Sequence, residues 1–156
     1  MTVVSDSSPL ILLSRIGLLE ILEQLYSVVL ITPEVERELT ARNSREPSAH
    51  SYNFISKLPA SSYQSISVSL GAGERSTIQA ALFLSANLVL LDDLAARHYA
   101  KKQGLAVAGC IGILESAFRR GYIPSLKSAF DDLMAAGAYN DRSLIEASLA
   151  NFENRS

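Results

Sequence analysis

The stretch LVLLDDLAAR, residues 88–97, joins a run of large apolar residues directly to two adjacent carboxylates and then to a helix-like segment. A nearly continuous apolar run is typical of a strand that is buried on both faces of a sheet. Asp92 and Asp93 carry like charges, and crowding them together costs free energy unless a cation or a proton relieves the repulsion. The stretch therefore predicts a buried strand with a metal site at its end.

The composition is that of one globular domain. A chain of 156 residues is long enough to bury a substantial core. Hydrophobic residues make up 48% and charged residues 19%, which excludes a disordered or low-complexity protein. The formal net charge of −2 excludes a protein that holds nucleic acid by positive charge alone.

The sequence also predicts the compartment. Cys110 is the only cysteine, so no disulfide can form within the chain, as expected in a reducing cytoplasm. The first ten residues lack the basic flank and long apolar run of a signal peptide. No apolar stretch approaches the roughly 20 residues needed to cross a bilayer. We expect a cytoplasmic protein without membrane contact.

Short apolar runs alternate with segments of helical spacing, which predicts an α/β fold. Connections that are long enough to hold helices imply parallel strands joined by right-handed crossovers. We expect a central parallel β-sheet of about five strands flanked by helices, a three-layer α/β/α arrangement. The predicted strands lie at 2–6, 27–31, 65–70, 87–91 and 105–109.

Two helical stripes precede the second and fourth strands, and a polar stretch at 41–51 predicts a surface loop. Gly17 predicts a break between two short helices in the first of these segments. The inward-facing residues expected are Leu10, Leu13, Leu18, Leu19 and Leu22 in the first segment, and Ile78, Ala81, Leu82 and Ser85 in the second.

Three further helical patterns follow the last strand, at 110–120, 125–136 and 141–152. Gly121 and Gly137 fall where C-terminal helix caps belong. No repeat or linker is visible, so the prediction is a single domain at 1–156, with C-terminal helices at about 124–153 packing on it.

Acidic residues follow the predicted strands repeatedly. Ligands of an open parallel sheet bind beyond the carboxyl ends of its strands, so acids from four chain segments are expected to meet at one edge. They are Asp6 after the first strand, Glu34, Glu36 and Glu38 after the second, Glu74 at the start of a helix, and Asp92 with Asp93 after the fourth.

Each acid also has a simpler explanation. Asp6 precedes SSPLILL and suits an N-cap, and Glu74 suits a first helical turn, where the helix dipole favours a carboxylate. Glu74 nevertheless lies four residues before Ile78, which places it on the inward stripe. An N-cap accounts for either Asp92 or Asp93, but not for both.

Helix geometry alone leaves two glutamates open after the second strand. Val35 and Leu39 form the inward pair of PEVEREL, and Glu36 and Glu38 flank that pair on opposite sides.

The ordered pattern of Asp6 followed by SSPLI, then PEVEREL, GAGE, LLDDLAAR and GLAVAGCIG, resembles the PIN-domain family. More narrowly, it is similar to small prokaryotic PIN proteins close to the VapC-type ribonuclease toxins of toxin–antitoxin pairs. The likeness covers roughly residues 2–125, and the last two helices are compatible with it. It implies a central parallel sheet, an acidic cluster that binds Mg²⁺ or Mn²⁺, and hydrolysis of single-stranded RNA.

The resemblance carries over to individual residues. It implies Asp6 as the first acid, Glu38 as the second because the family glutamate precedes a leucine, Glu74 as the third, and Asp93 as the fourth. These four are the expected catalytic residues, and together with Asp92 they are the expected metal ligands. Successive residues leaving a strand point to opposite sides, so Asp92 is expected to matter less than Asp93.

The chain departs from many toxin relatives at two positions. Leu91 stands where they have a small hydroxyl residue, and Glu74 stands where they commonly have aspartate. The alternative prediction is therefore a weakly active or inactive PIN-like protein that binds nucleic acid or serves as a scaffold. Receiver domains and halo-acid dehalogenase-like phosphatases fit less well, because the chain lacks the lysine after the last strand and the Asp-x-Asp at the first.

The resemblance implies two partners, single-stranded RNA and an antitoxin protein, and it also points to a second copy of the chain. Arg97 follows Asp93 by one helical turn and is a candidate RNA-phosphate contact, with a solvated helix face as the alternative. The leucine-rich segment 10–26 offers apolar surface for a homodimer, unless these residues simply complete the core.

Overall fold

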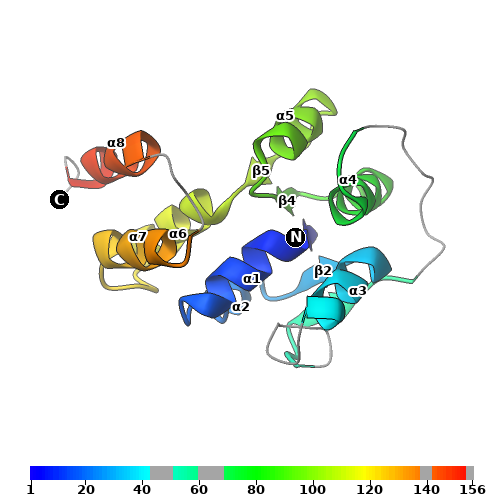
Figure 1. Ribbon diagram of the computed structural model, residues 1–156, viewed down its shortest axis with the longest axis horizontal. Helices are drawn as coiled ribbons and strands as arrows, with labels where there is room; N and C mark the ends of the chain where they lie inside the picture. The colour runs from blue at the N-terminus through cyan, green and yellow to red at the C-terminus, as the bar shows by residue number, and fades with distance from the viewer. Residues whose placement is uncertain (43–50, 60–68, 138–141, 154–156) are drawn as a thin grey trace.

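The structure, a computed structural model, describes residues 1–42, 51–59, 69–137 and 142–153 (Figure 1). A five-stranded sheet lies at its centre, and all strand pairs are parallel, as the sequence predicts. The strands stand in the order β3-β2-β1-β4-β5. They are β1 (Val3–Ser5), β2 (Val29–Ile31), β3 (Ile55–Lys57), β4 (Leu88–Leu90) and β5 (Val107–Ala108).

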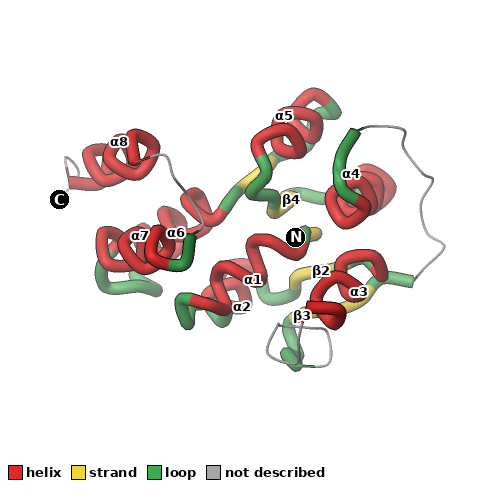
Figure 2. Tube along the Cα trace, viewed as in Figure 1, coloured by secondary structure: helices red, strands yellow, loops and turns green. Residues whose placement is uncertain are grey.

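Helices cover both faces of the sheet (Figures 1 and 2). Neighbouring residues of a strand point to opposite faces. Val3 packs in a core with residues of α1, α2, α6 and α7, whereas Val4 packs in a second core with residues of α4 and α5. The predicted three-layer α/β/α fold is therefore confirmed. The helices are α1 (Ser7–Arg15), α2 (Ile21–Tyr26), α3 (Pro33–Arg42), α4 (Ala72–Leu84), α5 (Leu94–Lys102), α6 (Cys110–Arg119), α7 (Leu126–Ala135) and α8 (Arg142–Glu153).

The third strand differs from the prediction. Residues 65–68 of the predicted run lie outside the described residues, as do residues 43–50 of the predicted loop, and Ser69 and Leu70 are not in a strand. β3 is formed instead by Ile55–Lys57, at the edge of the sheet. Only Ile55 of this strand is buried, and so short an edge strand carries almost no apolar pattern.

The inward stripe of α4 is predicted correctly only in its first half. Ile78 and Ala81 are fully buried, but Leu82 is 37% exposed. Ser85 is exposed as well, because it ends the helix in a left-handed conformation. Thr77, Gln79 and Ala80 are buried as well, so residues 76–81 are buried without interruption instead of along a single stripe.

The leucine-rich segment 10–26 packs mainly into the core. Within the fully described range 1–42, none of its large apolar side chains is exposed, and Leu10, Leu13 and Leu22 have no accessible surface. Leu12, Ile16, Leu18, Leu25 and Tyr26 are only partly buried against this core, so part of their apolar surface remains accessible and self-association stays a prediction. Gly17 separates α1 from α2, as predicted.

The helices after β5 follow the predicted pattern. Gly121 and Gly137 directly follow the last residues of α6 and α7 and their caps, with φ of 77° and 79°. These left-handed values favour glycine over residues that carry a Cβ atom. α7 and α8 each contact α6, and they contact each other.

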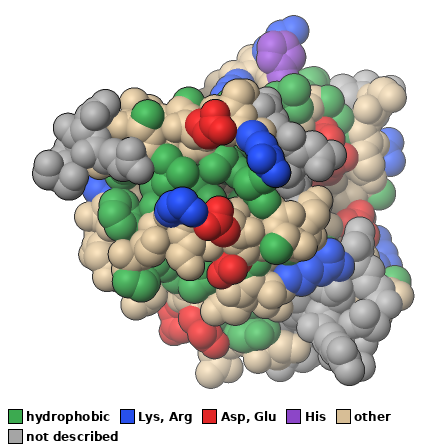
Figure 3. All heavy atoms as spheres, turned by 60° about the vertical axis from the view of Figure 1, so that its left-hand side comes forward, with side chains coloured by type: hydrophobic (Ala, Val, Ile, Leu, Met, Phe, Trp, Pro, Cys, Tyr) green, Lys and Arg blue, Asp and Glu red, His purple; other side chains and the backbone are tan. Residues whose placement is uncertain are grey.

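Two surface properties bear on function. Figure 3 turns the α6–α8 side of the molecule forward and shows apolar side chains at the centre of that face, with both acidic and basic ones among and around them. This mixture matches the small net charge of the chain. In the described part of the chain, no helix combines the length and apolarity needed to cross a bilayer.

Candidate functional site

The strand order creates a site between β1 and β4. The chain builds β2 and β3 on one side of β1, then returns to place β4 and β5 on the other. A crevice for ligands forms beyond the carboxyl ends of the strands at such a reversal. Asp6 directly follows β1, and its backbone N–H donates to the Leu90 carbonyl at 3.0 Å. Asp92 and Asp93 follow β4 by one residue.

Glu38 and Glu74 reach the same edge from α3 and α4, which contact each other. Glu38, Glu74 and Asp92 all act electrostatically on Asp6. Asp93 acts on Glu74. The five carboxylates predicted from the sequence therefore gather at one edge of the sheet.

Asp6 is the most buried of them, with 4% of its surface exposed. It occupies the N-cap position of α1 but makes no side-chain capping bond. Its Oδ1 atom is buried and has no hydrogen-bond partner among the described residues. The pKa of Asp6 is raised to about 7, mainly by burial and further by the charges of Glu38, Glu74 and Asp92, while a hydrogen bond from the backbone N–H of Ser7 acts in the opposite direction. A capping role therefore does not account for this side chain.

Glu38 ties three helices together. Its Oε2 atom accepts a hydrogen bond from the Ser7 hydroxyl of α1 at 2.7 Å, and its Oε1 atom accepts one from the Gly73 N–H of α4 at 3.0 Å. A Cβ atom on Gly73 would lie 2.5 Å from Oε1, so only glycine permits this approach. The motif GAGE therefore supplies the third acid, Glu74, and also the glycine that lets Glu38, the second acid, approach α4.

The other two glutamates of α3 do not take this place. Glu34 forms an ion pair with Arg37 at 3.5 Å, and Glu36 is buried with 7% of its surface exposed. Of the three, Glu38 is the one whose charge acts on Asp6 and on Glu74. Tertiary contacts thus make the choice between Glu36 and Glu38 that helix geometry leaves open.

Asp92 is held by the start of α6. Its Oδ1 atom accepts a hydrogen bond from the Cys110 N–H at 2.8 Å, and its Oδ2 atom accepts one from the Cys110 thiol at 3.2 Å. Burial, followed by the charge of Asp92, raises the pKa of the Cys110 thiol well above its usual range, so the thiol keeps its proton and can donate. A Cβ atom on Gly109 would lie 2.9 Å from Oδ1.

Asp93 and Glu74 make local capping bonds. Asp93 is exposed and caps α5, with its Oδ2 atom accepting from the Ala96 N–H at 2.9 Å. Glu74 is half-buried, and its Oε1 atom accepts from the Gly71 N–H at 3.0 Å. Burial raises the pKa of Glu74, and so do the charges of Asp93 and Glu38, while the Gly71 N–H lowers it. Asp93 and Glu74 thus each make a capping bond and also belong to the acidic edge.

Arg97 faces the site more than the solvent. It is half-buried, whereas Lys101 and Lys102 on the same helix are exposed. Its Nε atom is buried without a hydrogen-bond partner in the described part of the chain. Its Nη1 atom lies 3.4 Å from where a Cβ of Gly109 would stand, on the same side as the Asp92 carboxylate. The guanidinium therefore lies beside the fourth strand's acids.

Sequence reasoning missed the residues that hold these carboxylates. Ser7 directly follows Asp6, and Gly73 lies inside the motif GAGE, so only their membership of the quoted pattern could have indicated them. Cys110 is interpreted from the sequence only through its inability to form a disulfide. Nothing in the local sequence indicates that its thiol contacts Asp92, which is 18 residues away.

The donor chemistry fits a hard divalent cation, because Mg²⁺ and Mn²⁺ prefer carboxylate oxygens. The orphaned Oδ1 atom of Asp6 is one oxygen with no protein donor. The other carboxylates turn toward protein donors, and within the described ranges no three His, Cys, Asp or Glu side chains are grouped closely enough to hold an ion. The acids are thus assembled at one edge, but their oxygens do not converge on a single point.

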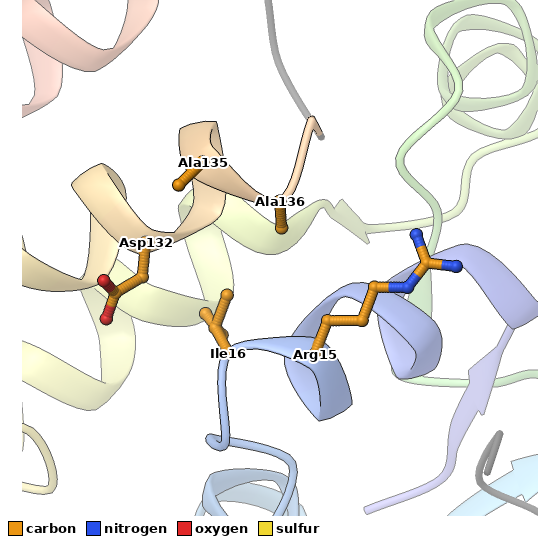
Figure 4. Close-up of a pocket in the computed structure, with 5 residues that line it drawn as sticks. All are labelled: Arg15, Ile16, Asp132, Ala135 and Ala136. Atoms are coloured by element: carbon orange, nitrogen blue, oxygen red, sulfur yellow. The ribbon is translucent and has the colours of Figure 1, made fainter.

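A separate cavity of about 460 Å³ lies between the end of α1 and α7 (Figure 4). Arg15, Ile16, Asp132, Ala135 and Ala136 line it, and the charged groups of Arg15 and Asp132 point away from each other. None of the predicted site residues lines this cavity, so it is distinct from the acidic edge.

Comparison with known families agrees with the fold. A family model described as DUF3368, PIN domain, matches residues 2–154, which is nearly the whole chain. No curated protein matches the chain. PIN domains are generally nucleases, and they typically use divalent metal ions. The chain belongs to the PIN-domain family.

Proposed function

We propose that the protein is a metal-dependent endoribonuclease that hydrolyses phosphodiester bonds in single-stranded RNA. The observation that carries this proposal is the burial of the Asp6 carboxylate without a hydrogen-bond partner for its Oδ1 atom among the described residues. The pKa of Asp6 is raised to about 7 by burial and by acids from three other chain segments. Such an arrangement destabilises the metal-free ionised site and favours a cation.

The residues proposed to hold Mg²⁺ or Mn²⁺ are Asp6, Glu38, Glu74, Asp92 and Asp93. When bound, a divalent ion supplies a water of lowered pKa and neutralises charge on the phosphate. Asp6 must lose its proton to serve as a ligand, so activity should rise with pH up to and through about 7. Ser7 and Gly73 orient the carboxylate of Glu38, which is also a proposed metal ligand.

Arg97 is the proposed phosphate contact. Its guanidinium lies beside Gly109 and Asp92, and its Nε–H has no acceptor among the described residues. Because Arg97 is only half-buried, its planar cation suits a phosphate oxygen of the RNA backbone. Such a contact positions the substrate without reading its sequence.

The competing proposal is a weakly active or inactive PIN protein that binds nucleic acid or acts as a scaffold. Leu91 favours it, because this side chain is fully buried in the second core and offers no hydroxyl to a substrate. The spread of the carboxylate oxygens over protein donors favours it too.

A cleavage assay separates the two. The purified chain is incubated with end-labelled single-stranded RNA, double-stranded RNA or single-stranded DNA in Mn²⁺, Mg²⁺ or a chelator. We expect cleavage of single-stranded RNA that needs the metal and is lost in Asp6→Asn. Asp131→Asn is the matched control, because Asp131 is an exposed acid in α7 whose side chain is 61% accessible. Metal-independent cleavage, or an equally active Asp6→Asn protein, would contradict the nuclease proposal, and binding without cleavage would support the scaffold.

Two partner proposals rest on family resemblance. We propose that the nuclease is the toxin of a toxin–antitoxin pair in the cytoplasm, controlled by an antitoxin protein, and that it forms a homodimer. Growth arrest on expression of the wild-type chain, absent with Asp6→Asn, is the expected result for a toxin. Light scattering that detects only monomer at micromolar concentration would exclude the dimer.

A further inference from the structure

The thiol of Cys110 occupies a specific place beside the acidic edge. Cys110 is the first residue of α6 and is fully buried. Its Sγ atom lies 3.2 Å from Oδ2 of Asp92 and 3.9 Å from the Pro9 carbonyl oxygen. A thiol has one proton to donate, and the shorter contact is to a carboxylate, which is the stronger acceptor.

We propose that Cys110 is a positioning residue, which fixes the Asp92 carboxylate beside Asp6 through its backbone N–H and its thiol together. The N–H donates to Oδ1 at 2.8 Å and the thiol to Oδ2. One donor leaves a carboxylate free to turn about its own axis. Two donors from a single residue, one on each oxygen, set its plane.

The residue before Cys110 supports this arrangement. A Cβ atom on Gly109 would meet Asp92 Oδ1 at 2.9 Å and the Leu91 carbonyl oxygen at 3.2 Å. Any side chain there would push Asp92 away from the N-terminus of α6. The pair Gly109–Cys110 therefore combines space for the carboxylate with the donors that orient it.

Glu38 is held in the same way as Asp92, by one side-chain donor and one backbone donor. Glu38 receives one hydrogen bond from the Ser7 hydroxyl and one from the Gly73 N–H. Asp92 and Glu38 thus each accept one side-chain and one backbone hydrogen bond, and both raise the pKa of Asp6. This repetition indicates that the Cys110 thiol acts as the counterpart of the Ser7 hydroxyl.

This inference rests on the proposed nuclease function, and a set of three variants tests it there. Cys110→Ser keeps a side-chain donor, Cys110→Ala removes it, and Cys110→Val removes it while filling the space. Groups that support a metal ligand typically contribute about 10- to 100-fold to affinity or activity. We expect Cys110→Ala and Cys110→Val to lower kcat in this range and to raise the Mn²⁺ concentration for half-maximal activity, with KM for RNA unchanged and Cys110→Ser close to wild type.

Ile113→Val is the matched control for packing. Ile113 is fully buried in the same helix and belongs to the same core, and its apolar side chain has no donor to offer Asp92. Its kcat and Mn²⁺ dependence should match the wild type, and thermal melts should show every variant folded. An equal loss of activity in Ile113→Val, full activity in Cys110→Ala, or failure of Cys110→Ser to restore activity would each overturn the positioning role.

A second measurement does not depend on cleavage. The chain has one cysteine, so the S–H stretching band in an infrared spectrum reports Cys110 alone. In the metal-free protein, Asp92→Asn replaces a charged acceptor by a neutral one, and the band should move to higher frequency. A control variant, Asp131→Asn, should leave it unmoved. An unshifted band in Asp92→Asn refutes the positioning role, whereas absent cleavage together with a shifted band refutes only the nuclease proposal.

Discussion

Asp92 and Asp93 are neighbours of the same residue type, yet the structure uses them differently. Asp93 is exposed and accepts a hydrogen bond from Ala96, three residues away. Asp92 is half-buried and accepts two from Cys110, eighteen residues away. The sequence predicts that Asp93 matters more. We propose the opposite order, because Asp92 is held by two donors and its charge acts on the buried Asp6.

The comparison extends to the whole acidic edge. We call Asp6, Glu38 and Asp92 the inner carboxylates. Glu38 and Asp92 accept hydrogen bonds from residues that lie far from them in the sequence, and the charges of both act on Asp6. Glu74 and Asp93, the outer carboxylates, cap the helices that carry or follow them. Inner and outer carboxylates therefore differ in what a substitution should change.

The largest effect is expected from Asp6→Asn on the pH dependence of stability. Below about pH 3.8 the carboxyl is protonated in both the folded and the unfolded chain, and from there to about 7 only the folded chain keeps the proton. Raising the pH through this window therefore lowers the free energy of unfolding. A shift of this size corresponds to as much as about 4 kcal/mol for a buried group.

Thermal and urea melts of both proteins between pH 4.5 and 8, without metal, measure this effect. Asp6→Asn should lose that component, so its stability relative to wild type should increase steadily up to about pH 7 and then level off. Parallel pH profiles for the two proteins would show that Asp6 does not titrate as proposed.

The next effect is stabilisation by metal. A ligand that binds only the folded chain at 100 times its Kd adds about 2.7 kcal/mol. Mn²⁺ should therefore raise the Tm of the wild type, more at pH 8 than at pH 6, because binding requires ionised Asp6. Asp6→Asn should respond much less. An equal rise in Tm at both pH values would show that metal binding does not depend on the ionisation of Asp6.

A smaller effect distinguishes the paired aspartates directly. Asp92→Asn should lower Mn²⁺-dependent cleavage by about 10- to 100-fold, since it disturbs an inner carboxylate held by two donors. RNA cleavage rates at several Mn²⁺ concentrations measure it. A greater loss in Asp93→Asn would restore the order predicted from the sequence.

The smallest effect is expected on stability in Asp93→Asn. Asparagine caps helices about as well as aspartate, so the free energy of unfolding should change by no more than a few tenths of a kcal/mol. Asp93→Ala should cost about 1 kcal/mol, because it removes the bond to the Ala96 N–H. Chemical denaturation measures both. If Asp93→Asn also cleaves RNA at the wild-type rate, Asp93 is a cap and not a metal ligand.

The fold was largely predictable because its signals are local. Buried strands such as Leu88–Leu90 need apolar residues on both faces, and helix ends such as Gly121 need a left-handed residue. β3 escaped prediction because an edge strand of three residues with one buried side chain has no such pattern. The stripe predicted on α4 is wrong at Leu82, which lies in the last turn of the helix but is 37% exposed, because the buried part of α4 ends at Ala81.

The sequence by itself determined which acids follow the strands, and a parallel sheet brings those acids to one edge whatever the details of packing. It left open whether Asp92 or Asp93 caps α5, and the structure shows that Asp93 does, through its hydrogen bond from the Ala96 N–H in the next turn. Contacts between distant segments bring Glu38 rather than Glu36 to Asp6 and bind Asp92 to Cys110, and burial in the fold raises the pKa of Asp6 to about 7. These outcomes depend on burial and on donors from distant segments, which meet only when the chain is folded.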